Sequence, residues 1–133
     1  MEVTGRCHCG AIAYRGVADP AKVTLCHCTD CQALTGSAYR ISVPVPAESF
    51  KLLSGKPKVY IKTAESGAKR AHSFCPDCGT PVFASAIENP TSYTLRVGNL
   101  DQRASLGPKR RIWWKSAMPW SENIAALPKQ DRQ

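Results

Sequence analysis

Two short stretches far apart in the sequence, Cys7-His8-Cys9-Gly10 and Cys75-Pro76-Asp77-Cys78-Gly79, decide how this chain folds. Each stretch presents two cysteines close enough to bind one metal ion, and four thiolates satisfy tetrahedral zinc. The glycine after each pair can adopt the positive φ of a tight turn whose backbone N–H groups point at the sulfur atoms. We therefore expect one structural zinc ion to join the start of the chain to its middle. Its four expected ligands are Cys7, Cys9, Cys75 and Cys78.

A third cluster, Cys26-His27-Cys28-Thr29-Asp30-Cys31, offers three cysteines and no obvious fourth ligand. Three protein ligands leave one metal position open to water or substrate, as in catalytic zinc sites. His27 stands between two cysteines, so in an extended segment its side chain points away from the metal, and His8 has the same position at the other site. His72 is the best remaining candidate for a fourth ligand. We expect Cys26, Cys28 and Cys31 to bind a second, more labile zinc ion.

Disulfide bonds are the alternative use of these cysteines. Seven cysteines leave one without a partner, the chain is long enough to build its own core, and nothing in residues 1–10 resembles a secretory signal. We therefore expect a reducing, cytoplasmic setting, in which closely spaced cysteines are metal ligands or redox motifs before they are structural bridges. Metal binding is the favoured interpretation.

Length and composition indicate one globular domain. The chain has 133 residues, 43% of them hydrophobic, and its apolar stretches are far shorter than the ~20 residues that cross a bilayer. We predict a zinc-binding domain over residues 1–128, no membrane segment, and a frayed tail over residues 129–133.

The net positive charge of the chain is smaller when metal-bound cysteines are counted as thiolates. The formal value of +8 counts every cysteine as neutral. Four thiolates around Zn²⁺ carry a net charge of −2 and three carry −1, which reduces the total to about +5. Such a protein attracts small anions such as a carboxylate-bearing thiol, and nucleic acid is the weaker expectation for a partner.

Apolar residues alternate with a period of two, which predicts half-buried strands and a mainly β fold. The alternating residues are Ile12 and Tyr14, Val59 and Ile61, Val82 and Phe83, and Tyr93, Leu95 and Val97. Frequent prolines make long helices costly. Two short helical turns are predicted instead, one begun by Thr29 or Asp30 and ended by Gly36, the other over residues 121–127 before Pro128.

The segment Lys109-Arg110-Arg111-Ile112-Trp113-Trp114-Lys115, followed by Trp120, mixes cations with large aromatic rings. Exposed rings among cations are typical of single-strand nucleic-acid surfaces. The favoured alternative is a strand whose tryptophans alternate between the core and a cleft while the basic side chains stay solvated. Arg110, Arg111 or Lys115 could then help to neutralise an anionic substrate.

In four groups of residues, the chain resembles the glutathione-dependent formaldehyde-activating enzyme family, which also includes centromere protein V. In order they are Gly5-x-Cys7-x-Cys9-Gly10 with Tyr14, Cys26-His27-Cys28-x-x-Cys31 with Gly36, Phe74-Cys75-x-x-Cys78-Gly79, and Gly98-x-Leu100-Asp101. The resemblance runs from about residue 3 to residue 128. One departure is Arg111 before Ile112, where many members carry a histidine.

The resemblance implies a β-tent of stacked antiparallel sheets in a single domain, stapled by the four-cysteine zinc. It also implies that Cys26, Cys28 and Cys31 hold the second zinc, where the family's named activity makes or breaks a carbon–sulfur bond of S-(hydroxymethyl)glutathione. A thiol in the open position of a three-thiolate site would be held as a thiolate, the nucleophile toward an aldehyde carbon. We therefore expect a zinc-dependent carbon–sulfur lyase with glutathione as the leading thiol.

A noncatalytic zinc module that contacts nucleic acid or protein is the competing class. The salt dependence of ligand binding distinguishes the two classes. Affinity for nucleic acid falls steeply with ionic strength, whereas capture of a thiol by zinc depends chiefly on pH.

Overall fold

The computed structural model describes residues 1–133 and has two β-sheets and one α-helix. This architecture confirms the predicted mainly β fold class. The smaller sheet has three antiparallel strands in the order β1-β2-β5. Their bounds are β1 (Glu2–Arg6), β2 (Ala13–Val17) and β5 (Lys51–Ser54).

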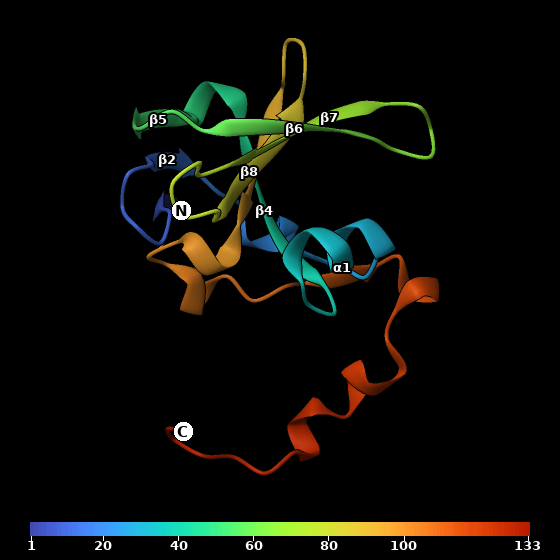
Figure 1. The fold of residues 1–133 in the computed structure, drawn as a ribbon. Helices are drawn as coiled ribbons and strands as arrows, with labels where there is room; N and C mark the ends of the chain where they lie inside the picture. The colour runs from blue at the N-terminus through green and yellow to red at the C-terminus, as the bar shows by residue number, and fades with distance from the viewer.

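The larger sheet has seven strands in the order β10-β3-β4-β9-β8-β7-β6. Their bounds are β10 (Arg110–Ile112), β3 (Thr24–Cys26), β4 (Arg40–Pro46), β9 (Ser92–Arg96), β8 (Pro81–Ala86), β7 (Lys69–Phe74) and β6 (Lys58–Thr63). Figure 1 labels β4, β8, β7 and β6 of this sheet. Neighbouring strands are antiparallel, except that β10 runs parallel to β3. The sheets are thus antiparallel, as expected, apart from this one edge.

The only α-helix, α1 (Thr29–Thr35), lies where a short helical turn was predicted, and it begins within the middle cysteine cluster, since Cys31 lies in its first turn. Gly36 ends it with a φ of 64°, a left-handed conformation that glycine adopts without steric cost. The predicted cap at Thr29 or Asp30 is wrong by one residue or two, because the sulfur of Cys28 accepts the N–H of Cys31. Cys28, which is a candidate metal ligand, therefore also caps the helix.

Short 3-10 turns make up the other helical segments, and none of the helices has the length and apolar run that a membrane span requires. The turns are η1 (Pro20–Lys22), η2 (Ala47–Ser49), η3 (Val97–Asn99), η4 (Arg103–Ser105), η5 (Trp114–Ser116), η6 (Pro119–Glu122) and η7 (Ile124–Ala126). The last two lie where the second helical turn was predicted. Figure 1 shows the chain beyond β10 running away from both sheets toward the C-terminus.

The hydrophobic core lies between the two sheets. Tyr14 on β2 is fully buried and packs edge-on against Phe83 of β8. Gly5 lies opposite Tyr14 in the β1–β2 register, and a Cβ at that position would come within 2.5 Å of the tyrosine ring. Glycine is therefore required there for the ring to turn into the core. Gly16 plays a similar part on β2, since its missing Cβ would lie 3.1 Å from Val45 of β4.

The family-like residues 98–101 are tied to the first strand. The N–H of Asp101 donates to the carbonyl of Thr4 at 2.9 Å, and the hydroxyl of Thr4 donates to the Asp101 carboxylate at 2.8 Å. Leu100 is fully buried beside them. This motif therefore anchors β1, and the cysteine pair that follows β1, against the body of the protein.

Two expectations about burial are wrong. Val59 and Ile61 of β6 were expected on the buried face of a half-buried strand, but both are exposed, at 47% and 44%, on a strand at the edge of its sheet. The predicted strand through the tryptophans stops at Ile112. Trp113 has a φ of 55° and Trp114 begins η5, so neither ring enters the core, although Trp113 does line a cavity, as expected for one of the tryptophans.

Candidate metal centres and the cationic cavity

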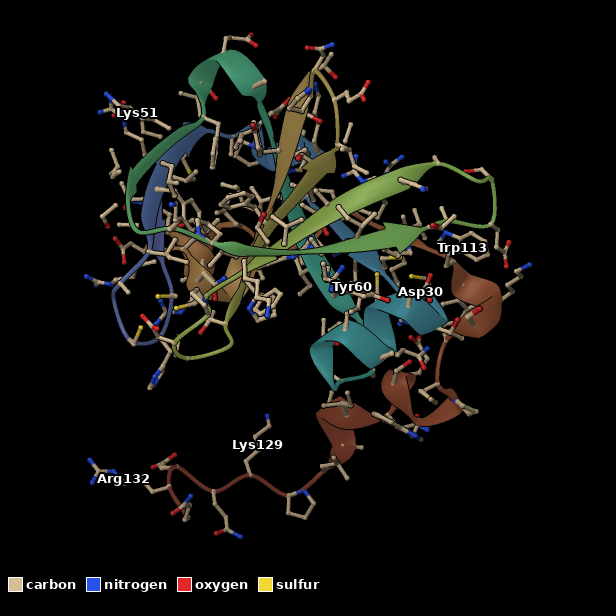
Figure 2. All side chains as sticks on the ribbon, turned by 45° about the horizontal axis from the view of Figure 1, so that its top comes forward. Asp30, Lys51, Tyr60, Trp113, Lys129 and Arg132 are labelled. Atoms are coloured by element: carbon tan, nitrogen blue, oxygen red, sulfur yellow. The ribbon has the colours of Figure 1, made fainter.

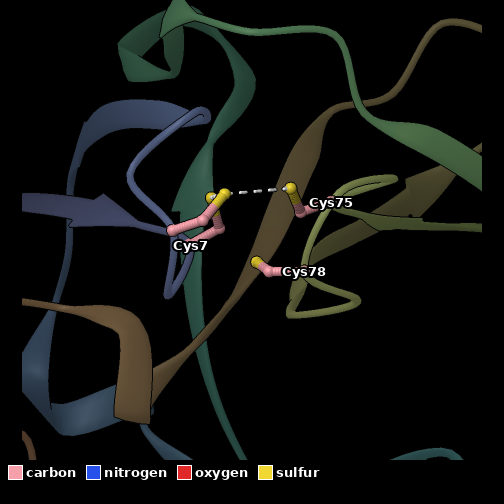
Figure 3. Close-up of side chains that lie close together, drawn as sticks. Cys7, Cys75 and Cys78 are labelled. Carbon is pink, nitrogen blue, oxygen red and sulfur yellow. Dashed lines mark hydrogen bonds between the residues drawn. The ribbon is translucent and has the colours of Figure 1, made fainter.

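The four cysteines that sequence analysis paired across the chain come together at one point. Their sulfur atoms all lie within 4.8 Å of one another. The contacts between Cys7 and Cys9 and between Cys9 and Cys75 are 3.6 and 3.7 Å. Tetrahedral zinc with zinc–sulfur bonds of ~2.3 Å separates its sulfurs by about 3.8 Å. Figure 3 shows Cys7, Cys75 and Cys78 facing one another between the N-terminal turn and the turn before β8.

Both turns have the shape that a structural metal site requires. Gly10 and Gly79 have φ values of 83° and 77°, and each closes its turn with an N–H that donates to the carbonyl of the first cysteine of its pair. The N–H of Ile12 donates to the sulfur of Cys7 at 3.2 Å. The hydroxyl of Thr80 lies 3.1 Å from the sulfur of Cys78, and hydrogen bonds with Thr80 lower the pKa of that thiol to about 5. The thiolate of Cys78 is thus stabilised even without a metal, whereas the neighbouring cysteines raise the pKa of Cys9 to about 12.

The second cluster brings Cys26, Cys28 and Cys31 together, with their sulfur atoms also within 4.8 Å of one another. Cys26 ends β3, Cys28 precedes α1, and Cys31 lies in its first turn, so strand and helix fix all three. Burial raises the pKa of Cys28, but hydrogen bonds with Cys31 and the charge of Lys62 outweigh it and lower that pKa overall. This donor set fits a soft divalent metal with one position left open.

The two histidines nearest the cysteine clusters are not among the grouped donors. His27 is fully buried, and its Nε2 accepts a hydrogen bond of 3.0 Å from Nε of Arg111. Arg111, which stands where many family members have histidine, therefore holds the ring of His27 in place. His8 lies next to the four-cysteine group without joining it.

A cavity of about 700 Å³ opens directly beside the three-cysteine cluster, and all three of its cysteines line it. The cavity lies over one face of the larger sheet. Side chains alternate between the two faces of a strand, so every second residue of successive strands points into the cavity. On β4, for example, Arg40, Ser42 and Pro44 line the cavity, whereas Val43 and Val45 point into the core. The metal candidate and the cavity thus belong to one site.

The cavity wall is strongly cationic. Six basic side chains line it and no aspartate or glutamate does. The six are Lys22, Arg40, Lys62, Arg70, Arg96 and Arg110. Asp30 at the start of α1 makes an ion pair of 3.0 Å with one of the six, Lys62, and lies on the same side of the molecule as Trp113 (Figure 2). A wall of this charge attracts anionic ligands and repels cations.

His72 lies on this wall and stays uncharged at neutral pH. Burial, followed by the charge of Arg96, lowers its pKa to about 4. Its Nδ1 is 3.3 Å from Nη2 of Arg96, which can only donate, so the histidine proton belongs on Nε2. His72 was the candidate for a fourth metal ligand, but the structure does not group it with the three cysteines.

Sequence reasoning found the cysteines but missed most of the cationic wall. Of the basic residues that it proposed, Arg110 lines the cavity, whereas Arg111 and Lys115 lie over the rings of Trp114 and Trp113 at 4.5 and 5.1 Å. The signal that could have found the wall is the alternation of polar residues along strands that also carry core residues, as in Arg70 and His72 of β7. Without the strand order, however, these pairs do not point to one place.

Comparisons with known proteins found a matching protein-family model and a solved structure of similar fold. A protein-family model described as glutathione-dependent formaldehyde-activating enzyme matches residues 2–116. The crystal structure of a Rhodobacter sphaeroides protein is similar, with a TM-score of 0.62 and 21% sequence identity. The similarity covers 81% of this chain and 98% of that chain. At this level of identity, the likeness concerns the fold alone.

Proposed function

Because the chain belongs to the glutathione-dependent formaldehyde-activating enzyme family, we propose that it is a zinc-dependent carbon–sulfur lyase acting on a thiol–aldehyde adduct. S-(hydroxymethyl)glutathione is the leading substrate. The observation that carries this proposal is the three-cysteine cluster, which is one ligand short of tetrahedral zinc and lines a cationic cavity large enough for a small peptide.

The two cysteine groups take different parts in this proposal. Cys7, Cys9, Cys75 and Cys78 hold a structural zinc, since four thiolates close its coordination. Cys26, Cys28 and Cys31 hold the second, more labile zinc beside the cavity. When bound there, zinc supplies a Lewis acid that keeps the substrate sulfur as a thiolate at neutral pH.

In the breakdown direction, the carbon–sulfur bond of the adduct breaks and its electron pair leaves with the sulfur. The hydroxyl oxygen of the adduct loses its proton as the carbonyl of formaldehyde forms, so thiol and aldehyde are the products. The cationic wall binds the carboxylates of glutathione and orients its sulfur toward the cysteines. We assign no general base, because the arginines and lysines of the wall are cations and His72, with a pKa of about 4, is too weakly basic at neutral pH.

Binding of the thiol should release a proton, and this tests the proposal. A free thiol with a pKa near ~8.5 must ionise to become a metal ligand. Titration calorimetry of glutathione in buffers of different ionisation enthalpy should therefore show about one proton released per thiol bound at neutral pH. S-methylglutathione, which has no thiol proton, is the matched ligand and should release none.

The protein control for this titration is Cys28→Ser. Serine can replace the helix cap that Cys28 provides, but it removes one thiolate from the open site. Proton release that persists unchanged in this variant would count against the proposed site.

A further inference from the structure

Two arginines of the cavity wall are buried without a charged partner. Arg40 is 7% exposed and Arg96 is 9% exposed, and in each the Nε atom is buried with no hydrogen-bond partner. Neither guanidinium takes part in any of the ion pairs of the structure. A buried charge without a partner is costly, so a protein that keeps two of them side by side has a use for them.

The strand register places these two side chains next to each other and next to the cysteines. Arg40 on β4 lies opposite Cys26 on β3, and Arg96 on β9 lies opposite Ser42, two residues along β4. Arg40 and Ser42 line the same cavity face, and neighbouring strands are only ~4.8 Å apart. The two guanidinium groups therefore flank one region of the cavity, within reach of a molecule that touches the cysteine cluster.

Most of the charge around Arg96 is positive, and only Cys31 and Tyr14 act in the opposite direction. Burial, then repulsion from Arg40, lowers the pKa of Arg96 to about 9, with a further contribution from Arg70. The only side-chain partner of Arg96 is the neutral ring of His72, and its other contact is the carbonyl of Thr94 at 3.5 Å. A guanidinium fork matches the two oxygens of a carboxylate or phosphate, so such a group would supply the negatively charged partner that both arginines lack.

We propose that Arg40 and Arg96 form an oxyanion-binding site that holds a carboxylate or phosphate group of the substrate. This proposal rests on the proposed function in one respect: the molecule that bears the oxyanion is taken to be a thiol. The same oxyanion chemistry belongs to a carboxylate-bearing thiol such as glutathione and to a thiol that carries a phosphate. Binding of the oxyanion itself requires no metal at the cysteines.

The Nε–H groups of the two arginines provide a direct test in the unaltered protein. Their ¹H–¹⁵N signals, assigned with Arg40→Lys and Arg96→Lys, are followed during titration with inorganic phosphate, acetate and chloride at constant ionic strength. We expect both signals to move downfield in a saturable way with at least one oxyanion and not with chloride, because a new hydrogen bond deshields the proton. If neither oxyanion produces a saturable shift, the site does not exist.

Substitution of the arginines tests which of them contribute to the affinity for the oxyanion. Arg40→Met and Arg96→Met should each reduce affinity for the oxyanion about tenfold or more, since each removes charge-assisted hydrogen bonds. Arg15→Met, an exposed change of equal charge on β2, should leave affinity unchanged. A loss of the same size in all three would mean that the oxyanion senses only net charge, which overturns the proposal.

Paired thiols identify the source of the oxyanion. Glutathione is compared with its diethyl ester, and phosphopantetheine with pantetheine. The charged member of one pair should bind about tenfold or more tightly, and Arg96→Met should abolish that difference. If neither charged thiol is preferred, the assignment of the oxyanion to the substrate is wrong.

This test is separable from that of the lyase. Cys28→Ser should lose thiol binding and keep phosphate or acetate binding. Oxyanion binding without any thiol binding in the unaltered protein would leave the arginine site standing and refute the lyase, and the reverse result would refute only the arginine site.

Discussion

Replacing Cys75 or Cys78 with serine is expected to unfold the protein, whereas Cys28→Ser leaves it folded. Cys75 is fully buried, and its sulfur contacts that of Cys9, 66 residues earlier in the chain. Structural zinc sites contribute about 10–16 kcal/mol of apparent binding energy. That is as large as the whole stability of a typical domain, about 5–15 kcal/mol. Loss of one thiolate from the closed site therefore removes the staple between the two turns.

Circular dichroism melts with metal analysis of the same samples measure this difference. Cys28→Ser is the matched substitution, because serine keeps the cap of α1 and the altered sulfur lies at the wall of an open cavity. We expect a cooperative melt close to that of the unaltered protein and one zinc ion fewer. Equal loss of structure in the Cys75 and Cys28 variants would mean that both cysteine groups are structural.

Exchange of formaldehyde between its free form and its glutathione adduct is expected to be accelerated by the protein and to return to the spontaneous rate in Cys28→Ser. Polarisation of the reacting atoms by a metal contributes several kcal/mol to the transition state. Each 1.36 kcal/mol changes a rate tenfold, so the loss should be at least about 100-fold. Exchange spectroscopy with ¹³C-formaldehyde measures both rates in one sample.

Arg15→Met serves as the control for this rate because it lies on the other sheet, and it should exchange as fast as the unaltered protein. A Cys28→Ser protein that is folded, lacks the second metal and still accelerates exchange would exclude the three-cysteine cluster from the chemistry.

The two cysteine groups could be predicted from the sequence because their determinants are local. The spacing within Cys7–Cys9 and within Cys75–Cys78, each followed by glycine, fixes a turn whatever surrounds it. Only one long-range step was then needed, the pairing of the two turns, and the four ligands of a tetrahedral zinc site predicted it; the four sulfur atoms do lie together. The end of α1 at Gly36 is equally local.

The cationic wall could not be predicted because it depends on strand order. Arg40, Arg70 and Arg96 come from three strands, and nothing in their own segments says that β9 and β8 lie between β4 and β7. The error at Val59 has the same origin. Alternation reports which residues share a face, but only the order of strands decides whether another layer covers that face.

Ligation of the substrate sulfur by metal at the three-cysteine cluster is the central claim, and selenium X-ray absorption tests it most directly. The selenol analogue of glutathione is added under anaerobic conditions to the zinc-loaded protein, so that selenium reports only on the ligand. We predict a zinc neighbour of selenium at slightly more than the ~2.3 Å of a zinc–sulfur bond, and its absence in Cys28→Ser. A saturated sample in which selenium has only light-atom neighbours would contradict the claim.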